Sequence, residues 1–324
     1  MTDFLLLEKV YKMIIGVSKP RLLYKKGLYL KGFFRPYMSM EEFTTSEVFS
    51  NVDETMPVIA RFSSMLGDSG TADTRRNIKC MAVKIHGNFG ELDIISQNMP
   101  VFFINKAKEI EGFADAFTCR TAFDKINSSK FWQMAVDNPE SVNCILHMFS
   151  HEGITDSFIT CRWHCVYTYI WYGTNQKKVM VRYRWIPVSA DIEYDCHTER
   201  KMTRLSAEFM AGFDPDIAYE QLEETVKEGR FPAFELQIQM VDHKYITHPE
   251  YTKQTLCWNE NLYKPVTVGV MKFTEVTGWG GKEYDEICFA PGNTPEGIEL
   301  YRDGLSELID YICRISAAER GAVE

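Results

Sequence analysis

The chain has 324 residues, 45% of them hydrophobic and 25% charged, which is the balance of a soluble globular protein with a sizeable core. Its formal net charge of −9 disfavours nucleic acid and other polyanions as partners, and no block of Lys or Arg suggests a membrane-surface patch. The 21 Phe, 16 Tyr and 6 Trp indicate an aromatic core that would suit a flat apolar ligand, although aromatic-rich β-proteins without a cofactor are common.

The first sixteen residues are apolar in places, but Asp3, Glu8, Lys9 and Lys12 interrupt them. This pattern predicts an amphipathic helix and neither a signal-peptide core nor a membrane span, so we expect a cytoplasmic protein. The nine cysteines are then expected to be reduced, and an odd number also argues against complete disulfide pairing. No Gly/Ser/Pro linker or internal repeat divides the chain, so residues 1–324 are expected to form a single domain.

Alternating apolar residues predict the strands, and two neighbouring strands face each other across the hairpin sequence GTNQKK. The predicted strands are 56–63, 81–86, 91–95, 159–172, 178–187, 232–240 and 264–274. Helical periodicity predicts helices at 106–120, 139–150, 200–212, 215–228 and from Pro295 to about Arg320. Because strands dominate the middle and helices interrupt and follow them, the fold class is α+β, built on an antiparallel sheet or barrel.

The segment CRWHC contains Cys161, His164 and Cys165, which look like metal ligands. On a strand, however, the two thiols share one face and His164 points to the other. A structural zinc site normally needs a second pair of ligands, and none is spaced to match. Buried core cysteines are therefore favoured over a zinc site.

The stretch that begins at Arg61 places Arg61 and Ser63 at the end of a strand, and later the amides Gln97 and Asn98 before the apolar run VFFI. Polar amides beside an aromatic wall would suit a small polar substrate above an apolar cofactor. From composition alone, a loop amide that caps a strand is the favoured interpretation.

The last predicted helix carries an apolar stripe, with Cys313 on its edge and Arg320 nearly two turns further along the same side. A thiol and a guanidinium roughly 10 Å apart along a helix axis match the span from a haem iron to a propionate. Taken alone, the residues favour a buried cysteine and a helix-terminal arginine that complements the helix dipole.

An ordered set of motifs over most of the chain resembles the haem catalase family. The family's motifs RFS and ADT-R-D-x-R-G-F-A-V-K resemble the stretch ARFSSMLGDSGTADTRRNIKCMAVKI, and its motif N-N-x-P-V-F-F-I resembles LDIISQNMPVFFI. Three further segments of the family resemble GRFPAFELQIQMV, YTKQTLCW and FAPGNTPEGIE. The length resembles that of the minimal catalases. The resemblance implies a catalase-like eight-stranded antiparallel β-barrel surrounded by helices, a deeply buried haem b, and a homo-oligomer, either a dimer or a tetramer.

Carried onto this sequence, the resemblance assigns the expected site residues. Tyr24, in RLLYKKGLYLKGFF, stands at the position of the catalytic distal histidine, and Gln97 at that of the distal amide. Cys313 stands at the position of the iron-binding tyrosine and Ile309 at that of the tyrosine's arginine partner, while a one-turn slip would bring Tyr311 nearby. The expected haem contacts are Lys26, Arg61, Ser63, Phe102 and Arg320.

These departures from the family predict an altered chemistry. A cysteine thiolate binds haem iron and favours O–O cleavage, whereas tyrosine is a poor base at neutral pH, so weak catalase activity is expected. The leading hypothesis is a haem-thiolate oxidoreductase that uses hydrogen peroxide or an organic hydroperoxide to oxidise or rearrange a small organic substrate. Tyr24 would donate a hydrogen bond to the bound oxygen, and Gln97 would orient it. The alternatives are a hydroperoxide rearrangement like that of catalase-related allene oxide synthases, a non-enzymatic haem carrier or sensor, and a scaffold that has lost haem.

Overall fold

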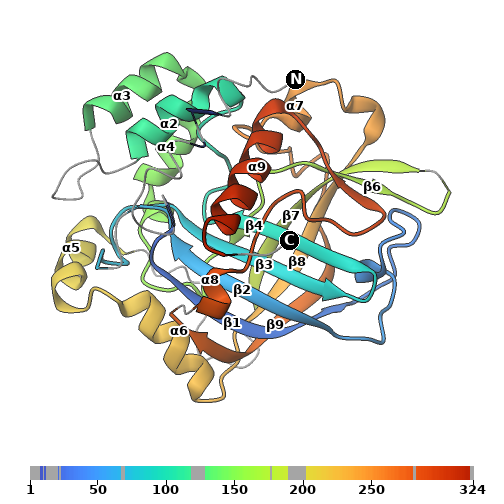
Figure 1. Cartoon of the computed structure of the whole chain (residues 1–324), viewed down its shortest axis with the longest axis horizontal. Helices are drawn as coiled ribbons and strands as arrows, with labels where there is room; N and C mark the ends of the chain where they lie inside the picture. Colours follow the sequence, from blue (N-terminus) through green and yellow to red (C-terminus); the bar gives the residue numbers. More distant parts are fainter. Residues whose placement is uncertain are drawn as a thin grey trace.

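The computed structural model describes residues 8, 9, 11, 21, 23–66, 70–117, 128–175, 177–188, 202–279 and 282–321 (Figure 1). The helix expected over the first sixteen residues lies outside the described residues, apart from Glu8, Lys9 and Tyr11, which are helical. Among the described residues, no helix is long and apolar enough to cross a membrane.

Eight antiparallel strands close into a barrel, because the first and last strands of the series β7-β5-β4-β3-β2-β1-β9-β8 also pair with each other. They are β1 (Gly27–Pro36), β2 (Met56–Ser64), β3 (Lys79–Gly87), β4 (Gly90–Gln97), β5 (Trp163–His164), β7 (Lys178–Val188), β8 (Ala233–Asp242) and β9 (Val266–Gly278). Two short strands, β6 (Tyr169–Tyr172) and β10 (Ile298–Leu300), extend the sheet beyond β7. The predicted α+β class and the eight-stranded antiparallel barrel are confirmed.

Aromatic side chains fill the inside of this barrel. Phe62 of β2 lies at the centre, with its ring centroid 5.6 Å from that of Trp163, 5.5 Å from that of Phe273 and 6.4 Å from that of Phe234. All four are buried, and they come from four different strands. The barrel interior is therefore a packed core, which accounts for much of the aromatic content of the sequence.

Helices cover the barrel in separate groups (Figure 1). The α-helices are α2 (Ile110–Phe117), α3 (Ser128–Asp137), α4 (Val142–Phe149), α5 (Arg204–Phe213), α6 (Ile217–Lys227), α7 (Pro249–Thr252), α8 (Lys282–Asp285) and α9 (Gly304–Ala318). Figure 1 shows α2, α3 and α4 together at one end, α5 and α6 along another side, and α9 across the face in view. The helices expected at 106–120, 139–150, 200–212 and 215–228 are present, with bounds that differ by a few residues where they are described.

Two predicted elements are wrong in extent. The strand expected at 159–172 is interrupted, because only β5 and β6 are extended and residues 165–168 between them are irregular. The final helix does not begin near Pro295 but at Gly304, since Asp303 has extended backbone and its carboxylate accepts the Ser306 N–H at 2.6 Å. The residues before this cap contain β10, which pairs with β6.

Candidate functional site

A row of buried polar side chains crosses strands β2, β3 and β4. Ser63 pairs with Cys80, and Cys80 pairs with Gln97, so the three side chains lie next to one another on the same face of the sheet. Their exposed fractions are only 3%, 6% and 6%. Ser63 and Gln97 were predicted as site residues from the sequence, but Cys80 between them was not.

Tyr24 lies beside this row in a strained backbone conformation. Its φ of 59° is the one positive value among the described non-glycine residues, and such values cluster at functional sites. Its N–H donates to the Met65 carbonyl at 3.1 Å, and its carbonyl accepts a 2.8 Å hydrogen bond from Arg61. Burial, and then the nearby thiols of Cys80 and Cys313, raise the pKa of Tyr24 well above its usual value. The side chain is therefore a neutral phenol that can donate a hydrogen bond.

Cys313 of α9 lies close enough to Tyr24 and Cys80 for their charges to interact. Burial raises the pKa of the Cys313 thiol to about 12, with Cys288 and Asp310 acting in the same direction. A thiol in such a place ionises only if a cation compensates for it, and a bound metal ion would do so. The expected metal ligand is thus brought together with the expected distal residue.

Tyr167 is a second phenol in this group, and sequence reasoning missed it. It is buried and lies in the bend between β5 and β6. Burial, followed by the charges of Cys313 and Cys165, raises the pKa of Tyr167 well above its usual value. Tyr24 and Cys80 are among its other neighbours, so two neutral phenols and two thiols share one buried region.

Three guanidinium groups gather around Tyr29 on β1. Arg21 donates to the Tyr29 hydroxyl at 2.9 Å, and the Arg61 guanidinium lies 5.4 Å from the Tyr29 ring centroid. Burial, followed by repulsion from Arg61 and Arg320, lowers the pKa of Arg21 to about 9. The acid nearest to Arg21 in the described structure is Asp285, whose carboxylate is 3.9 Å away. This concentration of positive charge is suited to an anion.

The arginines fit the propionate groups of haem. The buried Nε of Arg61 has no hydrogen-bond partner among the described residues, and an unpaired charged donor of this kind is costly unless a ligand accepts from it. Arg320, which follows the end of α9, donates to the Asp285 carbonyl and the Ser316 hydroxyl. The donor set therefore pairs a thiol for a metal with guanidiniums for carboxylates, which is what haem requires.

Lys26, whose haem contact stays a prediction, has three acceptors within the described chain. Its ammonium donates to the Thr71 carbonyl at 3.1 Å, to Asp73 at 2.6 Å and to Asp216. These three acceptors use all three donors of the ammonium group. Lys26 thus forms an ion pair between the residue before β1 and the start of α6. Arg21, which was not predicted from the sequence, lies near Arg61.

Gln97 and Phe102 are buried side chains with defined partners in the chain. The Gln97 amide nitrogen donates to the carbonyls of Met99 and Val101 at 3.2 and 2.8 Å, so both of its hydrogens are used. Its oxygen receives no hydrogen bond from any described residue and is free to accept one. Phe102 is buried, with its ring centroid 5.2 Å from that of Phe113.

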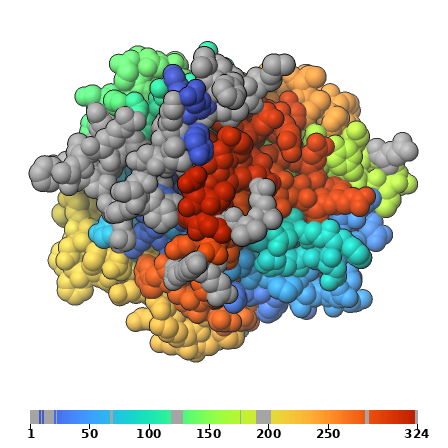
Figure 2. All heavy atoms as spheres, viewed as in Figure 1, coloured from blue at the N-terminus to red at the C-terminus, as the bar shows by residue number. Residues whose placement is uncertain are grey.

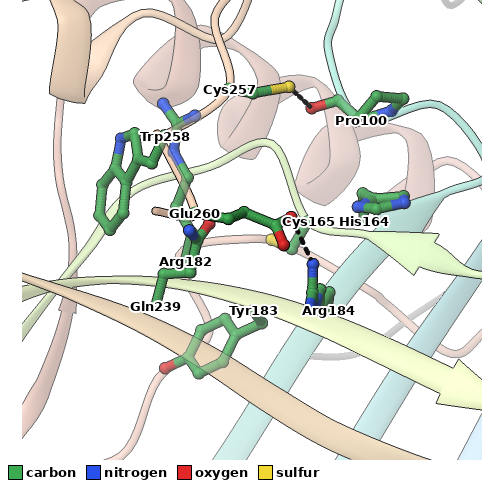
Figure 3. A pocket seen from close by; sticks show the side chains of 10 residues that line it. All are labelled: Pro100, His164, Cys165, Arg182, Tyr183, Arg184, Gln239, Cys257, Trp258 and Glu260. Carbon is green, nitrogen blue, oxygen red and sulfur yellow. Dashed lines mark hydrogen bonds and ion pairs between the residues drawn. The ribbon is translucent and has the colours of Figure 1, made fainter. Parts of the chain in front are cut away.

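The CRWHC segment lines a small separate cavity (Figure 3). His164 and Cys165 both face it, although alternation along a strand predicted opposite faces, because β5 ends at His164. The cavity has a volume of about 60 Å³, enough for a few water molecules but not for an organic substrate. Arg184 and Glu260 form an ion pair across it. No group of three potential metal ligands occurs within the described ranges, so this segment gains no support as a zinc site.

A closed antiparallel barrel surrounded by helices, with an iron-ligand candidate on the last helix, defines a catalase-like protein. The chain belongs to the catalase family, whose model matches residues 1–308, a range that ends before Cys313. It is 28% identical over 318 residues to Catalase-2 of Bacillus subtilis (strain 168) and 26% identical over 308 residues to a catalase of Latilactobacillus sakei. These matches cover 94% of this chain but only 44% and 62% of the two relatives, so the chain spans about half their length.

A solved bacterial catalase confirms the fold. It superposes with a TM-score of 0.84 at 20% identity, over 99% of this chain and 61% of that structure. Catalase-family membership and a catalase-like fold, both predicted from the ordered motifs, are therefore confirmed.

Proposed function

We propose that this protein is a haem-thiolate oxidoreductase that uses hydrogen peroxide or an organic hydroperoxide to oxidise or rearrange a small organic molecule. The observation that carries the proposal is that Cys313, Tyr24 and Tyr167 lie within electrostatic range of one another in a catalase-family fold. Haem b, when bound, would supply iron that exchanges electrons with peroxide. The relatives are named catalases, so action on peroxide is the part of the proposal nearest to them.

Residues of this chain would hold haem at its iron and at its propionate groups. Cys313 would bind the iron, and Arg21, Arg61 and Arg320 would bind the propionates. Phe102 would pack against the apolar part of the ring. The buried guanidinium charges are costly without a neighbouring anion, which the propionates would supply, and the ring would bury further apolar surface of Phe102.

Weak catalase activity follows from the residue at position 24. Disproportionation of hydrogen peroxide requires a base that moves a proton between the two oxygens, and such catalysis contributes about 10²–10⁴-fold. The Tyr24 phenol is a donor and not a base, because burial favours its neutral form. Tyr24 would therefore hold a peroxide oxygen by hydrogen bonding, while the Gln97 oxygen would orient the protonated end.

An apolar cavity supports an organic substrate. It has a volume of about 450 Å³, within the range of small-molecule sites, and is lined by side chains of α2, α3 and α4 with two arginines. Its lining residues are Leu66, Arg75, Arg76, Phe117, Ser128, Phe131, Trp132, Met148 and Phe149. A row of rings leads from this cavity to Phe102, since Phe117 lies 4.8 Å from Phe113, which lies 5.2 Å from Phe102.

Two other functions use the same site. A hydroperoxide rearrangement like that of allene oxide synthases would need the same thiolate and the same apolar cavity. A haem carrier or sensor is favoured by the replacement of the distal histidine, and it would bleach under peroxide without turning over a co-substrate. By analogy with the family, we also propose a homodimer or homotetramer.

The decisive experiment is an absorption spectrum of the purified, haem-loaded chain in the ferric and ferrous–CO forms. A thiolate ligand predicts the red-shifted ferrous–CO Soret band that distinguishes it from nitrogen and oxygen ligands. Cys313→Ala should remove this band, while Cys288→Ala, which removes the neighbouring thiol, should retain it. A parent protein without a Soret band, or a thiolate band that survives in Cys313→Ala, would overturn the proposal. Peroxide-dependent oxidation of an organic co-substrate then distinguishes an enzyme from a carrier.

A further inference from the structure

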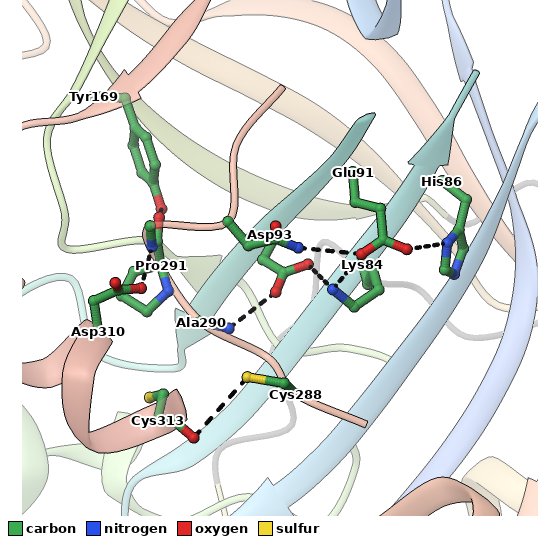
Figure 4. Close-up of polar contacts among 12 residues, drawn as sticks. Lys84, His86, Glu91, Asp93, Tyr169, Cys288, Ala290, Pro291, Asp310 and Cys313 are labelled. Carbon is green, nitrogen blue, oxygen red and sulfur yellow. Dashed lines mark hydrogen bonds and ion pairs between the residues drawn. The ribbon is translucent and has the colours of Figure 1, made fainter. Parts of the chain in front are cut away.

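The segment 288–293 lies between the barrel and helix α9 (Figure 4). On the barrel side, the fully buried Asp93 of β4 accepts the Ala290 N–H at 2.9 Å, and its own N–H donates to the Asn293 carbonyl at 3.0 Å. Lys84 of β3 holds the same carboxylate at 2.7 Å. Both strands therefore fix the segment in place.

On the helix side, the same segment is attached through Asp310. The Gly292 N–H donates to the Asp310 carboxylate at 2.7 Å, and Arg314 donates to its other oxygen at 3.1 Å. The Asp310 side chain is only 14% exposed. A Cβ atom added to Gly292 would lie 2.7 Å from this carboxylate, so the contact depends on glycine at that position. Tyr169 of β6 adds a 3.1 Å hydrogen bond to the Pro291 carbonyl.

Asp310 precedes Cys313 by three residues, which places the two on neighbouring positions of one helical face. The segment also contacts the Cys313 turn directly, since the Cys288 sulfur lies 4.0 Å from the Cys313 carbonyl oxygen. Figure 4 shows Asp310 and Cys313 on the same stretch of α9, with the Cys313 carbonyl oxygen directed toward Cys288.

The part of α9 around Cys313 is only partly buried against the core. The buried side chains of the helix are Leu305, Ser306 and Leu308 near its start and Ala317 near its end. The turns around Cys313 are half-buried and lie on the face of the molecule seen in Figure 2, where the red C-terminal residues reach the surface. Ile309 and Ile312 pack against the hydrophobic core on one side of these turns, and the polar contacts with the segment 288–293 add a specific restraint on the rotation of the Cys313 turn.

Because Asp310 and Cys313 are three residues apart on α9, the carboxylate places a negative charge near the sulfur, which the Arg314 guanidinium at 3.1 Å offsets in part. The geometry points to Asp310 as a positioning residue that fixes the Cys313 turn through the Gly292 N–H and makes the Cys313 sulfur a stronger electron donor. This inference rests on the proposed function, in which Cys313 binds the haem iron.

The test compares Asp310→Asn, Asp310→Ala and Gly292→Ala in the full chain loaded with haem. Asp310→Asn retains an oxygen acceptor but loses the charge, so the ferric/ferrous potential should rise while the Gly292 amide stays protected from hydrogen exchange. Asp310→Ala loses both the charge and the acceptor, so Gly292 protection should also fall, on the order of 10-fold or more, because the hydrogen bond is charge-assisted. Gly292→Ala keeps the charge but displaces the carboxylate, so it should broaden the electron paramagnetic resonance signal of the ferric iron.

Two matched variants control for charge and for glycine substitution. Glu319→Gln removes a negative charge from the exposed C-terminal end of α9 and should leave the ferric/ferrous potential unchanged. Gly304→Ala adds a Cβ atom whose nearest neighbour is 3.8 Å away, and it should leave the spectrum unchanged. An unchanged potential in both Asp310 variants, or an equal shift in Glu319→Gln, would overturn the inference.

The outcome separates this inference from the proposed function. A parent protein without the thiolate spectrum overturns the proposed function and the electronic part of this inference. Exchange at Gly292, measured in the purified full chain with and without added haem, still decides the positioning part. Equal Gly292 exchange in the parent and in Asp310→Ala would overturn that part whatever the spectrum shows.

Discussion

Removal of Arg21 should have opposite effects on the haem-free and the haem-loaded protein. The pKa of Arg21 falls from 12.5 to about 9, because the side chain is buried and lies near Arg61 and Arg320. Since the pKa of this base is lower in the folded chain than in the unfolded chain, its charge opposes folding at every pH below about 9. This lowering of the pKa from 12.5 to about 9 corresponds to a destabilisation of at most about 5 kcal/mol at neutral pH.

The substitution Arg21→Gln removes that cost and loses a hydrogen bond to Tyr29 worth about 1 kcal/mol. The haem-free variant should therefore be more stable than the parent by roughly 2–4 kcal/mol. When haem is bound, its propionates compensate for the guanidinium, and the same substitution removes a charge-assisted contact of about 1.5–3 kcal/mol. Haem affinity should then fall roughly 10–100-fold.

Denaturant unfolding of both forms, together with haem titration, measures the two effects. Arg35→Gln is the matched control, because Arg35 is exposed on the same strand as Tyr29 and its loss should change neither quantity by more than about 0.5 kcal/mol. If Arg21→Gln destabilised the haem-free chain, or left haem affinity unchanged, the assignment of this cluster to an anionic ligand would be refuted.

Two further predictions concern single groups. Tyr24→His should raise the rate of hydrogen peroxide disproportionation by about 10²-fold or more, because imidazole is a base and histidine tolerates a positive φ. Tyr24→Phe should not raise this rate. Oxygen release measures the rate, and equal rates in the parent and both variants would contradict the role of position 24. Burial raises the pKa of Asp93 from 3.8 to about 6, although Lys84 acts in the opposite direction. Because the unfolded chain loses this proton first, the contribution of Asp93 to stability should fall by up to about 3 kcal/mol as the pH rises from about 4 to about 6. Asn does not titrate, so Asp93→Asn is the reference. The unfolding free energy of the parent minus that of Asp93→Asn should decrease as the pH rises over this range, and a difference that does not change with pH would contradict the prediction.

Sequence periodicity predicted most of the barrel but not all of it. Strands such as β8 alternate buried and half-buried residues, and this pattern can be read directly from the sequence. Strand β1 was not predicted because Lys31, Gly32 and Arg35 interrupt its apolar residues. Its place in the barrel is set by pairing with β2 and β9, which are distant in sequence, and a local pattern contains no information on such pairing.

In the candidate site, too, some residues could be predicted from the sequence and others depend on the folded structure. Tyr24, Gln97 and Cys313 were predicted because they stand where a known motif has other residues. Cys80 could have been found by pairing the predicted strands 81–86 and 91–95 and extending the register to Gln97. Arg21 carries no local signal, since its role depends on where Arg61 and Arg320 lie in the folded chain.

Burial disfavours the charged forms of both Cys313 and Arg21, and a single ligand would stabilise both charges. Burial raises the pKa of the Cys313 thiol to about 12, so its thiolate needs a neighbouring cation. Burial lowers the pKa of Arg21 to about 9, so its guanidinium needs a neighbouring anion. No described side chain supplies a buried carboxylate to the arginine cluster, and the described thiols around Cys313 only oppose its ionisation. A ligand with a metal ion at its centre and carboxylates at its edge satisfies both requirements at once, which is why the proposed thiolate and the arginine cluster should be tested together.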